Sequence, residues 1–137
     1  MIKGRRPSPE ALRKYSADAE LAAKFSRLFG AARDAEDALR QAQARRAPGT
    51  ELRDLGLALD EALSAAMRAA YAAQRAQIGP LGYDDWIYRR KAKAKPKVKM
   101  WTAEAERLLT LREEHRLTGI PRVPLMARRL ATDTAPA

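Results

Sequence analysis

The sequence contains no cysteine, and this absence removes several classes of chemistry. Disulfide frameworks, thiol nucleophiles and cysteine-ligated zinc sites such as zinc fingers are all excluded. A chain without cysteine is also more typical of the cytosol than of an oxidising compartment. We therefore expect a cytoplasmic protein.

Aromatic residues are scarce, with two Phe, two Trp and four Tyr among 137 residues, although 46% of the residues are apolar. Much of the apolar share is alanine, so any core must be a thin seam between helices rather than a thick interior. The longest apolar stretches, Ala62–Met67 and Ala69–Ala73, are far below the roughly 18 residues that span a bilayer. The first residues lack the apolar segment of a signal peptide. We expect a soluble protein with no membrane partner.

Residues for catalysis are also few, because His115 is the only histidine and no glycine-rich phosphate loop or nucleophile elbow is present. His115 lies near an expected helix end, where its charge favours the helix dipole. The acidic pairs are explained by helix starts and solvated faces; they are Asp84/Asp85, Glu104/Glu106 and Glu113/Glu114. We expect no enzyme, no metal and no cofactor.

Two long helices are predicted in the first 80 residues. The motif Ser8-Pro9-Glu10 is typical of a helix start, and a stripe of apolar residues at three- and four-residue spacing follows it, with a weak point at Gly30. Pro48-Gly49 separates this helix from a second one, capped by Thr50 and running from about residue 51 to 77. The short connection predicts an antiparallel hairpin.

A second break at 79–82 is followed by the most aromatic segment of the chain, residues 83–88, for which we expect a short helix or turn. Residues 89–99 then carry seven cations and no acid, and mutual repulsion together with Pro96 predicts an extended linker. From Trp101, a helix capped by Thr102 is expected to run to about Arg116, and Leu117-Thr118-Gly119 ends it. A short helix through Leu130 follows.

The predicted fold class is therefore all-α, an antiparallel long helical hairpin followed by a basic linker and a small helical C-terminal segment. The expected divisions are residues 1–80 for the hairpin, 81–100 for the aromatic turn and basic linker, and 101–137 for the short helical segment. A hairpin with so little bulk buries limited area, so a second copy of the chain, another protein or the C-terminal segment is expected to complete it.

The net charge of +10 is concentrated rather than spread evenly. Residues 1–50 carry eleven basic and six acidic groups, and residues 81–100 carry seven and two, whereas residues 51–80 are nearly neutral. Such clustering is typical of proteins that bind polyanions through phosphate contacts. The candidate contacts are Arg5, Arg6, Arg45, Arg46, Arg89, Arg90, Lys91, Lys93, Lys95, Lys97 and Lys99.

The rings of Tyr83, Trp86 and Tyr88 stand next to this cationic run. In a chain with few aromatics, such rings are expected to anchor the core. Stacking on unpaired bases of a nucleic acid is the alternative.

The C-terminal part resembles a known family. The segment Trp101 to Arg112, with its tryptophan, threonine, acids and leucines, is similar to the first helix of a Myb/SANT-like repeat, and Met126 to Leu130 is similar to the second. The resemblance implies a helix-turn-helix in which Arg128 and Arg129 contact phosphates. It also implies core positions at Trp101, Leu108, Leu109, Leu111, Met126 and Leu130. The match stops before the recognition helix, so no base readout through that element is expected.

These patterns together favour a non-enzymatic nucleic-acid-binding protein that acts mainly through the phosphate backbone, such as a phage or bacterial regulator or a nucleoprotein subunit. DNA is favoured over RNA as the partner, which implies association with the nucleoid. The alternative is a protein-interaction subunit or inhibitor whose helical hairpin docks on a protein partner.

Overall fold

The computed structural model describes residues 6–119, and this range contains helices and no strand. The predicted all-helical class is therefore confirmed for the described residues. None of the helices in this range is both long and apolar enough to cross a membrane. The elements are α1 (Pro9–Ala22), α2 (Phe25–Ala44), α3 (Gly49–Ile78), the short 3-10 helix η1 (Pro80–Tyr83), α4 (Trp86–Ala92) and α5 (Pro96–Thr118).

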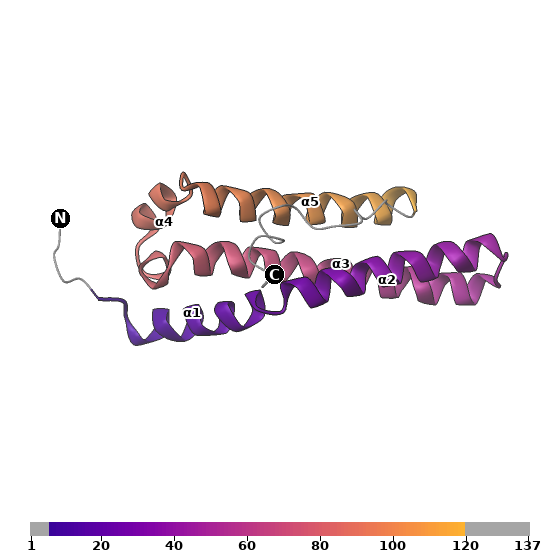
Figure 1. The fold of residues 1–137 in the computed structure, drawn as a ribbon, viewed down its shortest axis with the longest axis horizontal. Coiled ribbons are helices and arrows are strands. Elements are labelled where there is room, and N and C mark those ends of the chain that lie inside the picture. The colour runs from indigo at the N-terminus through magenta and orange to yellow at the C-terminus, as the bar shows by residue number, and fades with distance from the viewer. Residues whose placement is uncertain (1–5, 120–137) are drawn as a thin grey trace, which may run out of the picture.

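Helix α3 lies in the middle of an elongated bundle. The chain runs along α1 and α2 to one end, returns through α3, and turns at η1 and α4 to run back as α5 (Figure 1). Helices α1, α2 and α5 all pack against α3. We call the end that holds η1 and α4 the α4 end, and the end that holds the turn between α2 and α3 the far end.

The core is a narrow seam of small side chains, as the composition predicts. On α3, Leu59 and Leu63 are fully buried, and alanines take over in the second half of the helix. Helix α5 contributes Ala105 and Leu108, which are also fully buried. Small residues let helices approach closely, so this seam is packed although it holds few large side chains.

The first helical stretch is interrupted, but not where the sequence suggests. Gly30 lies within α2, and the break falls instead at Ala23 and Lys24, between α1 and α2. Directly after the break, Phe25 packs edge-on against Trp101 of α5, with ring centroids 5.1 Å apart. Because this ring contact joins segments far apart in the sequence, local propensity does not reveal the break.

The expected extended linker at residues 89–99 is wrong. Residues 89–92 belong to α4, and α5 already begins at Pro96. Proline is tolerated at the first position of a helix, where its missing N–H group has no intrahelical partner. Ile78, Ala92 and Val98 form a small buried cluster that holds the two helices against the end of α3.

Because α5 starts early, Thr102 is not a helix cap as expected. Its hydroxyl group lies one turn inside the helix, where it donates to the Val98 carbonyl (2.9 Å) and accepts from the Gln74 amide of α3 (2.6 Å). The predicted end of this helix is confirmed, since α5 stops at Thr118 and Gly119 has φ of 112°.

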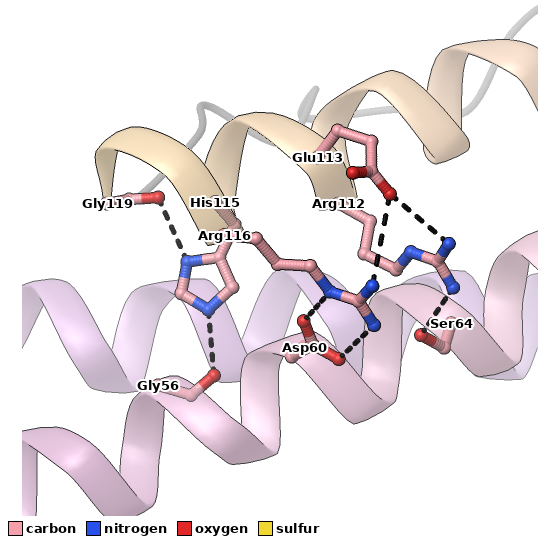
Figure 2. A network of polar contacts seen from close by, with 8 residues as sticks. All are labelled: Gly56, Asp60, Ser64, Arg112, Glu113, His115, Arg116 and Gly119. Carbon is pink, nitrogen blue, oxygen red and sulfur yellow. Dashed lines mark hydrogen bonds and ion pairs between the residues drawn. The ribbon is translucent and has the colours of Figure 1, made fainter.

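Polar contacts fasten the second half of α5 to the first half of α3 (Figure 2). Arg116 donates to both carboxylate oxygens of Asp60, at 2.6 and 3.1 Å, and Arg112 donates to the Ser64 hydroxyl group at 3.2 Å. The hydrogen bond from Arg116 holds the pKa of Asp60 below its usual value, against a smaller opposing effect of burial. These contacts fix the register of α5 on α3.

His115 takes part in the same network rather than only favouring the helix dipole. One ring nitrogen lies 2.8 Å from the Gly56 carbonyl oxygen of α3, and the other lies 2.9 Å from the Gly119 carbonyl oxygen (Figure 2). Carbonyl oxygens only accept hydrogen bonds, so the bond at each position requires a proton on the ring nitrogen. The side chain thus joins α3 to the C-terminal end of α5.

We expect Leu59→Ala to lower the free energy of unfolding by about 2–5 kcal/mol, because it leaves a cavity in the seam. Leu57 lies two residues earlier on the same helix and is 63% exposed, so Leu57→Ala should change stability by no more than about 0.5 kcal/mol. Urea unfolding followed by circular dichroism measures both. Equal losses for the two variants would contradict the packing described here.

Candidate nucleic-acid interface

Six of the seven cations in the run from Arg89 to Lys99 are exposed to solvent. The exception is Arg89, which is half-buried and donates to the Gly82 carbonyl oxygen at 2.7 Å. Arg89 therefore holds α4 against η1, and this structural role was not expected from the sequence. The six exposed cations are Arg90, Lys91, Lys93, Lys95, Lys97 and Lys99.

The structure brings Arg6 to the same end of the bundle. Ser8 caps α1 by accepting from the Ala11 N–H group (3.0 Å), as predicted. Ser8 also donates its own N–H and hydroxyl groups to the Asp84 carboxylate, at 2.6 and 2.7 Å. These bonds hold the start of α1 beside the segment that leads into α4, so the exposed Arg6 lies at the α4 end. We call Arg6 and the six exposed cations the basic end.

Arg45 and Arg46 are not brought to this cluster. They lie at the far end, in the turn between α2 and α3, and the thirty residues of α3 separate them from α4 by about 45 Å. Arg45 is also paired with Glu51. The remaining candidates, Arg5, Arg128 and Arg129, lie outside the described residues.

The cations of the basic end have no acidic partner, whereas about half of the other cations among residues 6–119 are paired with a carboxylate. Among residues 6–119, several arginines elsewhere are paired with carboxylates, as in Arg40–Glu36, Arg107–Glu104 and Arg116–Asp60. Within the same range, no ion pair involves any of the six exposed cations that follow Arg89. Their positive charge is therefore not neutralised by a carboxylate of residues 6–119.

The aromatic residues beside the run divide into two groups. Tyr83 is half-buried and donates its hydroxyl group to Asp18 of α1, as expected of a core anchor. Trp86 and Tyr88, in contrast, are 59% and 37% exposed. The expectation that these rings anchor the core is wrong for Trp86 and Tyr88, because the inner face of α4 is formed by Arg89 and Ala92 instead.

Asp18 of α1 joins this helix to α3 and η1 near the basic end. Arg75 of α3 donates to its two carboxylate oxygens at 2.8 and 3.1 Å, and Tyr83 of η1 donates to it as well. Burial raises the pKa of Asp18, but the bonds from Arg75 and Tyr83 and the charge of Arg75 more than offset this, so the pKa lies below its ordinary value of 3.8. Burial and the bond to Asp18 raise the pKa of Tyr83.

One acidic residue was placed wrongly by the sequence. Glu104, expected in the first turn of a helix that begins at Trp101, lies inside α5, is only 1% exposed and accepts from Arg107 at 2.6 Å. Among the residues that the structure describes, no group of acidic residues and histidine is arranged to hold a metal ion.

A groove of about 800 Å³ runs between α1, α3 and α5 on the side of the bundle. Alanines and the larger side chains Tyr15, Phe25 and Trp101 line it, and polar groups make up nearly half of its exposed surface. No sequence pattern predicts this groove, because the break between α1 and α2 that borders it is not evident from the sequence.

No protein-family model, no curated protein and no solved structure matches this chain. The resemblance of residues 101–112 and 126–130 to Myb/SANT-like repeats stays a prediction. Trp101, Leu108 and Leu111 are buried, as that resemblance implies, but Leu109 is only partly buried, and Met126 to Leu130 lies outside the described residues.

We expect Asp18→Asn to destabilise the protein by about 1 kcal/mol at neutral pH, since part of the network is exposed to water. The folded-state pKa of Asp18 lies below its unfolded value, so its contribution is present above pH 3.8 and is lost as pH falls further. Unfolding measured across pH should therefore show the difference between wild type and variant shrinking at acidic pH. The exposed Asp34→Asn serves as control, and a difference that grows on acidification would refute the assignment.

Proposed function

We propose that the protein binds nucleic acid through the phosphate backbone, using the basic end as its contact surface, and that it does so without catalysing a reaction. The observation that carries this proposal is the set of exposed cations after Arg89, gathered at one end of the bundle with no acidic partner among residues 6–119. Lysine and arginine side chains that neutralise phosphates release counterions, and this release supplies affinity without sequence preference.

The helix dipole of α5 supports the same conclusion. Lys97 and Lys99 lie in or just after the first turn of α5. This end of a helix carries a partial positive charge from the backbone dipole, so acidic side chains stabilise it and basic ones destabilise it. The first turn of α5 contains no acid. Because cations at this position disfavour the helix, stability does not explain them, whereas binding of an anion does.

The geometry favours DNA or RNA as a surface-bound polymer rather than as a deeply enclosed ligand. The six cations belong to α4, the turn at 93–95 and the start of α5, so a folded framework holds them at fixed spacing. DNA is the partner that we propose first, consistent with a regulator or nucleoprotein subunit.

A role in protein interaction is the second candidate, and the groove between α1, α3 and α5 is the observation that favours it. In this case the hairpin of α2 and α3 with the adjacent groove would dock on a protein, or on a second copy of the chain. A tight protein partner whose capture survives nuclease and high salt, and is lost in Ala76→Arg, would support this candidate over the first.

We expect the triple variant Lys93→Gln, Lys95→Gln and Lys97→Gln to bind duplex DNA more weakly and with a shallower dependence on salt. Each phosphate contact contributes about 0.9 to the slope of log affinity against log salt, so the slope should fall by up to about 2.7. Fluorescence anisotropy over a salt series measures both quantities.

The matched control removes the same charge from the far end, with Arg45→Gln, Arg46→Gln and Arg53→Gln. These residues are exposed but lie about 35–45 Å from α4, so this variant should lose less affinity. If the two triple variants lose affinity equally, binding depends only on the net charge of the protein, and the basic end is not a specific binding site for nucleic acid.

Lys97→Glu should separate stability from binding. An acid near the start of α5 complements the helix dipole, so we expect the free energy of unfolding to rise by about 0.3–1 kcal/mol. Affinity for DNA should fall in the same variant, because two units of positive charge are lost from the basic end. Thermal unfolding and anisotropy test the two effects, and a variant that is both less stable and equally tight in binding would contradict the proposal.

A further inference from the structure

Trp86 is exposed in a chain that buries or hydrogen-bonds most of its other rings. Phe25, Phe29 and Trp101 are 2 to 6% exposed, and Tyr83 is bonded to Asp18, whereas Trp86 is 59% exposed. Exposing an indole ring gives up the free energy of burying a large apolar surface. Its place at the surface therefore indicates contact with another molecule.

The outward orientation of Trp86 is fixed by the way α4 is held. Asp85 caps the helix by accepting from the N–H groups of Ile87 and Tyr88, at 3.0 and 3.1 Å. Arg89 is bonded to the Gly82 carbonyl oxygen, and Ala92 is buried beside Ile78 and Val98. Arg89 and Ala92 therefore face inward. Ile87 and Lys91 lie on the opposite face of the helix, and Trp86 lies on its flank, where it is 59% exposed.

A shallow hollow of about 580 Å³ lies on this outward face. It is lined by Trp86, Ile87, Arg90, Lys91 and Ala94, so a ring and two cations border the same depression. The Arg90 guanidinium carbon lies 6.0 Å from the centroid of a Trp86 ring. Lys93 and Lys95 follow directly along the chain, which extends the positive charge beyond the hollow.

A nucleotide combines the two chemical groups that this hollow complements, a flat base and a phosphate. In a duplex the faces of the bases are covered by their neighbours, and only phosphates are open to a surface-bound ring and its cations. In a single strand the base face is accessible, and stacking on an aromatic side chain adds affinity to the phosphate contacts.

The same residues fit a membrane surface less well. Helix α4 has seven residues and is only about 10 Å long, and its exposed apolar side chains are confined to Trp86, Ile87 and part of Tyr88. Interfacial helices bury a longer apolar face in the lipid headgroups. The observations therefore favour a nucleic acid.

We propose that the basic end binds single-stranded nucleic acid, with the Trp86 ring stacking on an unpaired base and Arg90 and Lys91 contacting the adjoining phosphates. This inference rests on the proposed function and adds to it a preference for unpaired strands. It makes Trp86 a binding residue, while the lysines that follow contribute to all phosphate polymers alike.

Intrinsic fluorescence provides a direct test, because the chain has two tryptophans with opposite environments. Binding of oligodeoxythymidylate to the full chain should quench the exposed Trp86 and leave the buried Trp101 unchanged. In Trp86→Phe, where Trp101 is the only tryptophan left, the quenching should disappear. Persistent quenching in that variant, or none in the wild type, overturns stacking by Trp86.

Affinity measurements separate this inference from the proposed function. Trp86→Ala should weaken binding of oligodeoxythymidylate by at least about fivefold, the effect of one lost stacking contact, while binding of a DNA hairpin of similar charge stays within twofold. Trp86→Phe should recover part of the loss. If Trp86→Ala affects neither polymer, the stacking proposal fails while the phosphate proposal stands, whereas absence of salt-dependent binding to both polymers removes the proposed function as well.

The control variant is Leu12→Ala, which removes an exposed apolar side chain from α1, outside the hollow. It should leave binding of the single strand unchanged. Vesicles containing phosphatidylserine form the last arm of the test. Binding to the vesicles that is weakened by both Trp86→Ala and Ile87→Ala, without binding of oligodeoxythymidylate, would assign the hollow to lipid and overturn the proposal.

Discussion

The close packing of α1, α2 and α5 around α3 is the constraint on which the rest of the molecule depends. In its second half, α3 is lined by alanines that are almost completely buried, so neighbouring helices approach it without the bulk that would hold them apart. Across this seam Phe25 packs against Trp101, and at the α4 end Ser8 is hydrogen-bonded to Asp84. The bonds of Ser8 hold Arg6 beside the cations that follow Arg89, so the composition of the basic end depends on the packing of α1 against that end of the bundle.

The parts of the fold that the sequence predicts correctly are those decided by local chemistry. Ser8 and Pro9 begin α1, and Gly119 ends α5, because each residue has a backbone or side-chain property that suits a helix terminus. Pro96 is ambiguous in the sequence, because proline disrupts the interior of a helix but is favoured at its first position. The burial of Val98 beside Ile78 and Ala92 decides between these outcomes, and that contact is tertiary.

The candidate site shows the same division. The cations that follow Arg89 are evident from composition, but their arrangement is not. From the sequence, Arg6 and Arg45 are equally good candidates for phosphate contacts. In the structure the length of α3 separates Arg45 from α4, while the bond between Ser8 and Asp84 places Arg6 beside it. The exposure of Trp86 depends on which face of a seven-residue helix meets the bundle, and so short a helix has no clear apolar periodicity from which to read that face.

The bundle is elongated (Figure 1), and the basic end places exposed cations at one of its two ends, so the molecule is electrically asymmetric along its axis. In the field of a polyanion, a body of this kind turns its positive pole toward the polymer and points its long axis away from it. A molecule bound in this orientation occupies only its width along the strand, about two helix diameters or 20–25 Å, rather than its length. In that orientation the far ends of neighbouring molecules point away from the strand, and the grooves on the sides of the bundles face the neighbours rather than the polymer.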